Sequence, residues 1–171
     1  MRKIVVTIFV LLCFILQSGV FTNLSFAGII PNLMIILNSC FGFMRGEKEG
    51  LIIGFFCGLL SDIFFGDILG FYALILMYIG FINGKFCGIF YPEDIKLPIA
   101  LIIISDLSYG VICYVLLFLL RGRLNLPFYF TRIILPEMLY TIVVTIFLYP
   151  LILKVNEKLE SREKRSAQKF V

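Results

Sequence analysis

The 171-residue chain is 61% apolar and 15% charged, with a mean hydropathy of +1.05, whereas soluble domains are about 25% charged. It has too few polar side chains to cover a water-facing surface, so the composition excludes an ordinary soluble domain and indicates a membrane protein. Basic residues in loops on one side of a membrane explain the net charge of +4, which gives no reason to expect a nucleic-acid partner.

Six apolar stretches, separated by charged residues, proline or glycine, predict an all-α, polytopic membrane helix bundle with about six transmembrane helices. A helix needs about 20 residues to cross the roughly 30 Å hydrocarbon core of a bilayer. The second and third stretches are short for this, and we expect them to be tilted or partly shielded by neighbouring helices. The stretches form a predicted transmembrane domain over residues 1–153 and span 4–21, 29–44, 51–65, 69–87, 97–120 and 133–153.

The first stretch follows Arg2 and Lys3, and a secretory signal peptide has the same basic start and apolar run. A signal peptide also ends at a small-residue cleavage site. Residues 17–21, Gln-Ser-Gly-Val-Phe, lack such a site and continue the apolar run. The pattern therefore favours a retained first helix over a cleaved signal.

Basic residues are distributed unequally between alternate loops. With an internal N-terminus and six crossings, twelve of the 15 Lys and Arg residues lie inside, while the three outside are Arg121, Arg123 and Arg132. Loops rich in Lys and Arg remain in the cytoplasm. We therefore expect both termini to be cytoplasmic.

Residues 154–171 form a predicted basic cytoplasmic tail. Its basic residues suit the anionic cytoplasmic leaflet, and Glu160 with Lys164 gives one favourable pair if the tail is helical. The composition favours a tail that faces solvent and lipid. A docking site for a cytoplasmic partner is the alternative.

Glycines recur every four residues along the third and fourth stretches. Because four residues make slightly more than one helical turn, neighbouring members of each series share a helix face. Small residues on such a face let two backbones approach closely in a membrane. We expect internal packing between the two helices, with docking of a second protein as the alternative. The two series are Gly46, Gly50, Gly54 and Gly58, and Gly80, Gly84 and Gly88.

Three acidic residues, Asp62, Asp106 and Glu137, lie within predicted membrane helices. A charge at the centre of a bilayer costs at least about 2.5–3.5 kcal/mol, so these groups should be paired, capped or protonated. We favour a structural role over a proton relay or a ligand anchor. For Asp62 we expect hydrogen bonds from the turn Gly66–Gly70, or a pair with a basic residue of an outer loop, that fixes the join between the third and fourth helices.

The chemistry of known catalytic motifs is missing from the sequence, which predicts that the chain is not an enzyme. It contains no histidine, the commonest general base and metal ligand, and no phosphate loop or nucleophile elbow. Its five cysteines stand singly within apolar runs and read as small hydrophobic residues rather than a disulfide or zinc framework. We expect no cofactor and no metal.

Several motifs resemble the rod shape-determining protein MreD family, over essentially the whole chain. The Gln17-Ser18 pair, with Pro31-Asn32-Leu33 after it, is similar to the end of the family's first helix and the start of its second. The most specific part is residues 28–74, where Arg45-Gly46 leads into the glycine series and Asp62, and Gly70 follows in a Leu-Gly-Phe-Tyr-Ala-Leu stretch. Late in the chain, residues 132–140 are similar to the final-helix pattern around Pro136, although Glu137 and Tyr140 depart from it.

The resemblance implies a non-enzymatic scaffold subunit of the bacterial cell-elongation complex in the cytoplasmic membrane. Its implied partners are the bitopic protein MreC and, through it, the actin-like MreB and the elongation peptidoglycan synthases. The family fold resembles the six-helix substrate-binding subunits of energy-coupling-factor transporters, which makes a vitamin-type small-molecule binding subunit the alternative function. A proton-coupled carrier is less well supported, because the chain has no visible inverted repeat.

Overall fold

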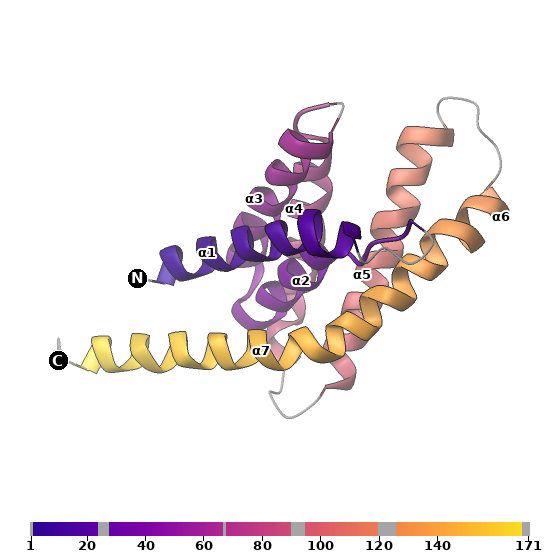
Figure 1. Cartoon of the computed structure of the whole chain (residues 1–171). Coiled ribbons are helices and arrows are strands. Elements are labelled where there is room, and N and C mark those ends of the chain that lie inside the picture. The colour runs from indigo at the N-terminus through magenta and orange to yellow at the C-terminus, as the bar shows by residue number, and fades with distance from the viewer. Residues whose placement is uncertain (1, 24–27, 67, 90–94, 120–125, 169–171) are drawn as a thin grey trace.

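The computed structural model describes residues 2–23, 28–66, 68–89, 95–119 and 126–168 and is built from helices (Figure 1). The last residue of the fifth predicted stretch, Leu120, lies outside these ranges, as do Arg121, Arg123 and the end of the predicted tail. The helices are α1 (Arg2–Ile15), α2 (Leu33–Arg45), α3 (Glu47–Phe65), α4 (Phe71–Gly84), α5 (Lys96–Tyr114), the short α6 (Leu126–Tyr129) and α7 (Leu135–Gln168).

Turns of other helical types extend these elements. A π-helical segment, Leu16–Phe21, continues α1, another, Val115–Leu119, continues α5, and a third, Phe130–Ile134, joins α6 to α7. A 3-10 turn, Lys85–Ile89, follows α4. Each extension lengthens an apolar helix toward the thickness of a membrane.

Four helical segments in the described ranges are long and apolar enough to cross a membrane: Lys3–Phe21, Phe71–Ile89, Lys96–Leu117 and Pro127–Glu163. They correspond to the first, fourth, fifth and sixth predicted stretches, although the last segment begins earlier and extends further than 133–153. The third stretch forms the 19-residue α3, which begins before residue 51 and carries charged side chains at both ends. The count of six crossings remains a prediction.

The second stretch forms the centre of the molecule. α2 has 13 residues and is buried from Leu33 to Phe43. It contacts α1, α3, α4, α5 and α7. At 1.5 Å per residue it is about 20 Å long, shorter than the roughly 30 Å hydrocarbon core. Neighbouring helices therefore shield it from lipid, as the shortness of this stretch suggested.

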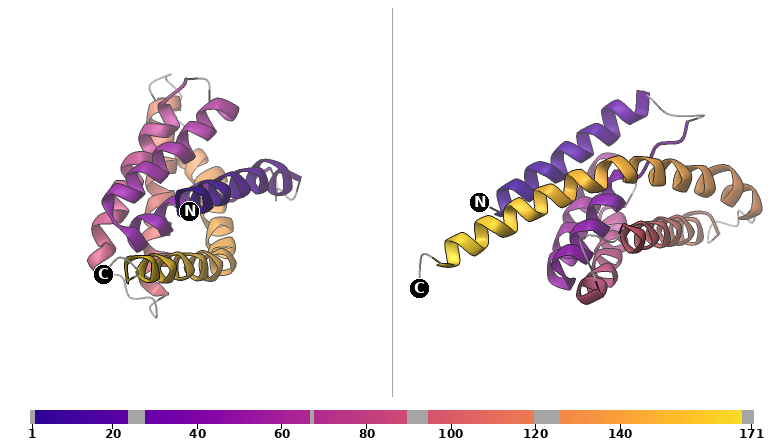
Figure 2. Two further views of the ribbon diagram at one scale, coloured as in Figure 1. Left: turned by 90° about the vertical axis from the view of Figure 1, so that its left-hand side faces the viewer. Right: turned by 90° about the horizontal axis from the view of Figure 1, so that it is seen from below.

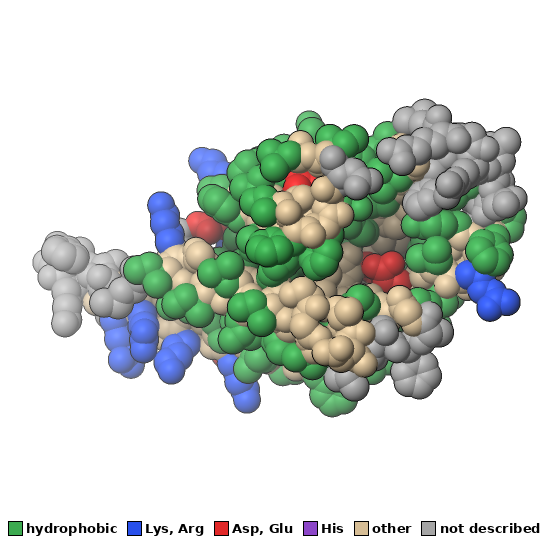
Figure 3. Space-filling model, turned by 45° about the horizontal axis from the view of Figure 1, so that its top comes forward, with side chains coloured by type: hydrophobic (Ala, Val, Ile, Leu, Met, Phe, Trp, Pro, Cys, Tyr) green, Lys and Arg blue, Asp and Glu red, His purple; other side chains and the backbone are tan. Residues whose placement is uncertain are grey.

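The remaining helices are arranged around α2. α3 and α4 form a closely packed hairpin, and α1 and α7 cross this hairpin obliquely (Figures 1 and 2). The two chain ends lie on the same side of the molecule (Figure 1). Basic side chains gather at that end in the view of Figure 3. The placement of this end in the cytoplasm stays a prediction.

α7 continues without a break through the predicted boundary between Leu153 and Lys154. One face of this extension is docked onto the bundle, since Asn156 and Leu159 are 5% and 6% exposed. Arg45, the last residue of α2, donates from Nε to the Asn156 side-chain oxygen at 2.5 Å, and its guanidinium lies 3.5 Å from the Glu163 carboxylate. The start of the predicted tail is therefore held against the end of α2.

Candidate functional site

Glycines bring the backbones of α3 and α4 into direct contact. A Cβ atom added to Gly54 would collide with the carbonyl of Leu76 on α4. Gly50 and Gly80 face each other, so that a Cβ atom on either would collide with the backbone of the other. The four-residue spacing thus serves the internal packing that the sequence predicted. We call this contact between α3 and α4 the glycine seam.

Two members of the predicted glycine series have other surroundings. Gly46 joins α2 to α3 with a φ of +95°, a conformation that side chains with a Cβ atom rarely adopt. Gly88 has no atom within 4 Å of a Cβ position. Gly70, which precedes α4, also has a positive φ, of +98°. Gly46 and Gly70 are therefore turn residues, whereas Gly50, Gly54 and Gly58 are packing residues.

Asp62 closes the glycine seam at the end where α3 turns into α4. One carboxylate oxygen accepts the Gly70 and Ala73 N–H groups at 3.0 and 2.9 Å, and the other accepts the Tyr72 N–H at 2.8 Å. The side chain is 2% exposed and sits at the N-terminus of α4, where backbone N–H groups have no helical partner. Asp62 thus receives hydrogen bonds from the end of the predicted turn and from the first turn of α4.

A chain of side-chain amides and hydroxyls crosses the buried centre. The Asn38 amide on α2 donates to the Leu76 carbonyl at 2.7 Å. The Asn83 amide on α4 donates to the hydroxyls of Ser39 on α2, at 3.1 Å, and Ser105 on α5, at 2.8 Å. These bonds tie α2, α4 and α5 together where lipid supplies no hydrophobic drive for helix association.

The N-terminal end of α2 is held by α7 and by the extension of α1. Pro31 is buried directly before it, and Asn32 caps the helix by accepting the Ile35 N–H at 3.3 Å. The Asn32 N–H donates to the Thr141 hydroxyl on α7 at 3.1 Å. The Met34 N–H donates to the side chain of Gln17 in the extension of α1, at 3.2 Å. The Gln-Ser and Pro-Asn-Leu motifs of the sequence therefore meet at this point.

Asp106 on α5 and Glu137 on α7 come together in the interior, although 31 positions separate them in the sequence. They are close enough to interact electrostatically, and Glu137 also interacts with the Asn32 side chain. Asp106 is 4% exposed, its carboxylate oxygens make no hydrogen bond of good geometry, and the Thr141 side chain is close enough to interact with it. Asp62 and Asp106, which the sequence treats alike, thus differ: Asp62 accepts three backbone hydrogen bonds, whereas Asp106 has only the Thr141 side chain beside it as a hydrogen-bonding group.

Tyrosine side chains from three helices lie near one another beside Glu137. Tyr109 on α5, Tyr72 on α4 and Tyr129 on α6 all lie within electrostatic range of one another or of Glu137. The rings of Tyr72 and Tyr109 are 6.1 Å apart between centroids. Figure 3 shows acidic side-chain atoms in a hollow of one face of the molecule, with hydrophobic side chains on both sides of it.

Pro136 lies at the start of α7, immediately after the π-helical segment. The Leu135 N–H bonds to the Phe130 carbonyl five residues earlier, so the ordinary helical register is already interrupted before the proline. Because proline has no N–H to donate, a register change at this point removes the penalty of placing it in a helix. Pro136 therefore lies in the first turn of α7, directly before Glu137.

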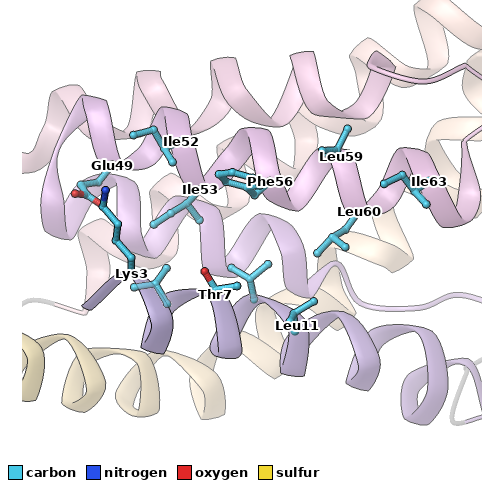
Figure 4. A pocket seen from close by; sticks show the side chains of 12 residues that line it. Lys3, Thr7, Leu11, Glu49, Ile52, Ile53, Phe56, Leu59, Leu60 and Ile63 are labelled. Carbon is cyan, nitrogen blue, oxygen red and sulfur yellow. The ribbon is translucent and has the colours of Figure 1, made fainter. Parts of the chain in front are cut away.

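An apolar groove of about 500 Å³ runs between α1 and α3 (Figure 4). Ile52, Phe56 and Ile63 of α3 are each at least half exposed along it. Lys3 and Glu49 lie together at one end, the end that carries the chain termini (Figure 4). At the other end of α3 the two helices meet, because the Phe14 ring of α1 lies 5.0 and 5.8 Å from the rings of Phe64 and Phe65. The sequence showed only that these stretches were apolar and could not indicate the groove between them.

Within the described residues, no group of three or more Cys, Asp or Glu side chains could hold a metal ion. What the site offers is close helix packing, a capped turn, a buried polar network and an acid pair. Sequence reasoning missed Asn38, Asn83, Asn156 and Thr141. Their isolated position within apolar stretches was the signal that could have found Asn38, Asn83 and Thr141, whereas Asn156 lies among the charged residues of the tail and gave no such signal.

A bundle of apolar helices around a shielded central helix defines a polytopic membrane protein. The model of the rod shape-determining protein MreD family matches residues 1–159 of the chain. The chain therefore belongs to this family of membrane proteins that determine cell shape. No curated protein and no solved structure gives a significant match.

Proposed function

We propose that the chain is a non-enzymatic scaffold subunit of the cell-elongation complex in the bacterial cytoplasmic membrane. In this proposal it crosses the membrane six times with both termini inside, in a fold like that of energy-coupling-factor substrate-binding subunits. It binds an MreC-like bitopic protein and, through that protein, connects MreB with the elongation peptidoglycan synthases. The match of the family model to residues 1–159 is the observation that carries the proposal.

The packing of the molecule supports a scaffold. The glycine seam and the hydrogen bonds of Asp62 fix α3 against α4, and the Asn83 bonds fix α4 against α2 and α5. A partner that packs on such a body meets a surface of defined shape, so little conformational entropy is lost on association.

The groove between α1 and α3 is the place where we expect the partner's single transmembrane helix to pack. Its walls are large apolar side chains with exposed fractions of 50% for Ile52 and 55% for Phe56. Lys3 and Glu49 lie at the end of the groove that is cytoplasmic in the proposed topology, where charged residues commonly flank a transmembrane helix. A helix in this groove would cover the apolar surface that α1 and α3 leave exposed between them.

Site-specific photo-crosslinking tests the proposal. Phe56 is replaced by p-benzoyl-phenylalanine in the full chain, which is co-expressed with the bitopic MreC-like protein encoded in the same organism. Irradiation of membranes should give a crosslinked product of the two proteins. The same replacement at Tyr78 is the matched control, because Tyr78 is also aromatic and is 56% exposed, but lies on α4 outside the groove.

The possible outcomes test the groove as the interface and the scaffold function separately. A crosslink at Phe56 and none at Tyr78 supports both the scaffold and the groove. Co-purification of the two proteins in mild detergent with a crosslink at Tyr78 alone moves the interface away from the groove and keeps the scaffold. Failure of the two proteins to co-purify, with normal cell width in a strain that lacks the chain, contradicts the scaffold itself.

A further inference from the structure

Thr7 places a hydroxyl group in an otherwise apolar part of the groove between α1 and α3. Among the described residues that line the groove, it is the one with an uncharged polar side chain; Lys3 and Glu49 are charged and the others are apolar. Thr7 lies on α1, and its hydroxyl oxygen points toward α3 (Figure 4). It follows Lys3 by four residues, about 6 Å along the helix, so it lies one turn inside the charged end of the groove.

The Thr7 hydroxyl has no hydrogen-bond partner among the described residues. Other helical hydroxyl groups of this chain donate to the carbonyl four residues earlier: Ser18 at 2.9 Å, Ser61 at 3.1 Å and Thr145 at 2.6 Å. Threonine in a helix can make the same bond, but Thr7 does not make it to the Lys3 carbonyl. The Thr7 side chain is also exposed, so its hydroxyl is available to a molecule that enters the groove.

The surroundings of this hydroxyl favour a protein helix over a lipid chain as the occupant of the groove. Thr7 belongs to the segment Lys3–Phe21, which is apolar and long enough to cross a membrane. Hydrocarbon tails neither donate nor accept hydrogen bonds, so a lipid chain would cover the apolar walls and leave the hydroxyl unpaired. A helix can present a polar side chain to it, and hydrogen bonds of this kind help to hold transmembrane helices together.

We propose that the partner's transmembrane helix carries an uncharged polar side chain, an amide or a hydroxyl, that forms a hydrogen bond with Thr7 in the groove. This inference rests on the proposed function, which places a single transmembrane helix there, and adds the chemistry by which that helix is recognised. The partner's polar residue lies about one turn inside the cytoplasmic end of its helix, at the depth of Thr7. A charged side chain does not fit there, because the groove offers apolar neighbours such as Val10 and Ile53 at this depth. The hydrogen bond also sets the register of the helix, as single polar residues do between packed helices.

The test compares the full chain with a Thr7→Val variant, in which a methyl group replaces the hydroxyl and the shape of the side chain is kept. The dissociation constant of the complex with the MreC-like protein of the same organism is measured in one mild detergent, by titration of the fluorescently labelled partner. We expect Thr7→Val to raise this constant about 3- to 30-fold, the effect of losing one hydrogen bond between helices in a membrane. Thr7→Ser keeps the hydroxyl and should bind nearly as tightly as the wild type.

Thr22→Val is the matched control for the loss of a hydroxyl. Thr22 is exposed directly after the extension of α1, lies outside the lining of the groove and donates to the Ser18 carbonyl at 2.7 Å, so its replacement should leave the dissociation constant unchanged. Thr7→Val should also leave the thermal unfolding midpoint of the chain alone unchanged, because the hydroxyl makes no bond within the described chain.

Substitutions in the partner identify the other half of the hydrogen bond. Each uncharged polar residue of its transmembrane helix is replaced in turn by an apolar residue of similar size. One of these replacements should weaken binding to the wild-type chain but not to the Thr7→Val variant, as expected when both changes remove the same hydrogen bond.

Three results would overturn this inference: a dissociation constant of Thr7→Val equal to that of the wild type, a loss of affinity with Thr7→Ser as large as with Thr7→Val, or a partner helix without uncharged polar residues. Together with a crosslink at Phe56, each of them contradicts the hydrogen bond alone and leaves the scaffold proposal intact. A crosslink at Tyr78 alone removes the helix from the groove and overturns the inference while the scaffold remains. A wild-type chain that does not bind the MreC-like protein contradicts the scaffold proposal and the inference with it.

Discussion

The Asp62 carboxylate is the side chain on which the geometry of the α3–α4 turn depends. It accepts the N–H groups of Gly70, Tyr72 and Ala73 while it is almost completely buried. Two of these N–H groups belong to the first turn of α4, where they have no carbonyl partner within the helix. The carboxylate therefore satisfies donors that would otherwise be buried and unpaired, and the helix dipole stabilises its negative charge.

Replacement of Asp62 should separate the contribution of shape from that of hydrogen bonding. Asp62→Asn keeps an acceptor of similar size but points an amide N–H toward backbone donors, so we expect moderate destabilisation. Asp62→Leu leaves the donors unpaired, at about 1–3 kcal/mol each, and should be clearly more damaging. Thermal unfolding of the purified variants and their levels in the membrane are the measurements.

Glu157→Leu is the control for removing an acidic side chain, because Glu157 is exposed. This variant should have the thermal unfolding midpoint of the wild type. Equal, wild-type stability of Asp62→Asn and Asp62→Leu would show that the cap contributes nothing. Normal stability with loss of the co-purifying partner would instead assign Asp62 to an interface.

The sequence predicted individual residues as far as local spacing determines their neighbours. Asp62 lies four residues after Gly58 and eight before Gly70, so its place at the turn follows from the chain itself. The meeting of Asp106 with Glu137 could not be predicted in this way. Helical periodicity shows which residues share a face but not which helix that face meets, and the partners here lie 31 positions apart.

At the scale of the helices, the glycine seam leaves no room for a side chain. A Cβ atom at Gly54 would collide with backbone atoms of Leu76 and with the side-chain oxygen of Asn38. Backbone atoms cannot move aside as a flexible side chain can, so the helices would have to separate. Their separation would also strain the Asn38 hydrogen bond to the Leu76 carbonyl, which joins α2 to the seam.

A single added methyl group should therefore be enough to disturb the hairpin. We expect Gly54→Ala to destabilise the chain by about 1–3 kcal/mol, the usual cost of overpacking, despite the better helix propensity of alanine. Gly19→Ala is the matched control, because Gly19 is also helical and has no atom within 4 Å of a Cβ position. Thermal unfolding in one detergent compares the two variants, and a Gly54→Ala midpoint at or above that of Gly19→Ala would contradict the close packing.

Helix order and approximate extent could be predicted from apolar runs, whereas the role of α2 could not. Its sequence resembles a short transmembrane stretch, and only contacts with five other helices make it the centre of the bundle. The docking of the α7 extension was missed for the same reason. Arg45 and Asn156 are 111 positions apart, and each appeared as an ordinary boundary residue in the sequence.

For the whole molecule, the contact of Arg45 with α7 bears on how many times the chain crosses the membrane. Arg45 ends α2 and contacts Asn156 and Glu163 in the helix extension that leads to the C-terminus. The turn at Gly46 therefore lies at the end of the molecule that carries both termini. This position favours two crossings by α2 and α3 over a hairpin that enters and leaves on the outer side.

The last prediction distinguishes six crossings from four. Alkaline phosphatase fused after Phe26, Gly66 or Asn125 should be active, and fusions after Asp94 or Ser166 should be silent, for either count; Phe26, Asp94 and Asn125 lie outside the described residues. Position 48 separates the two topologies, because it is cytoplasmic with six crossings and not with four.

We expect a silent fusion after Lys48. In the full chain, a Lys48→Cys variant without the five native cysteines should react with a membrane-impermeant maleimide only after the cells are opened. A Ser166→Cys variant is the control for an inner position and Gly66→Cys for an outer one. Labelling of Lys48→Cys in intact cells would reduce the count to four, because α2 and α3 would then form an outer hairpin. Labelling of Lys48→Cys and Ser166→Cys to the same extent, and only in opened cells, would establish six crossings. Both α2 and α3 must then cross the membrane, because the turn at Gly46 lies beside the C-terminal extension of α7.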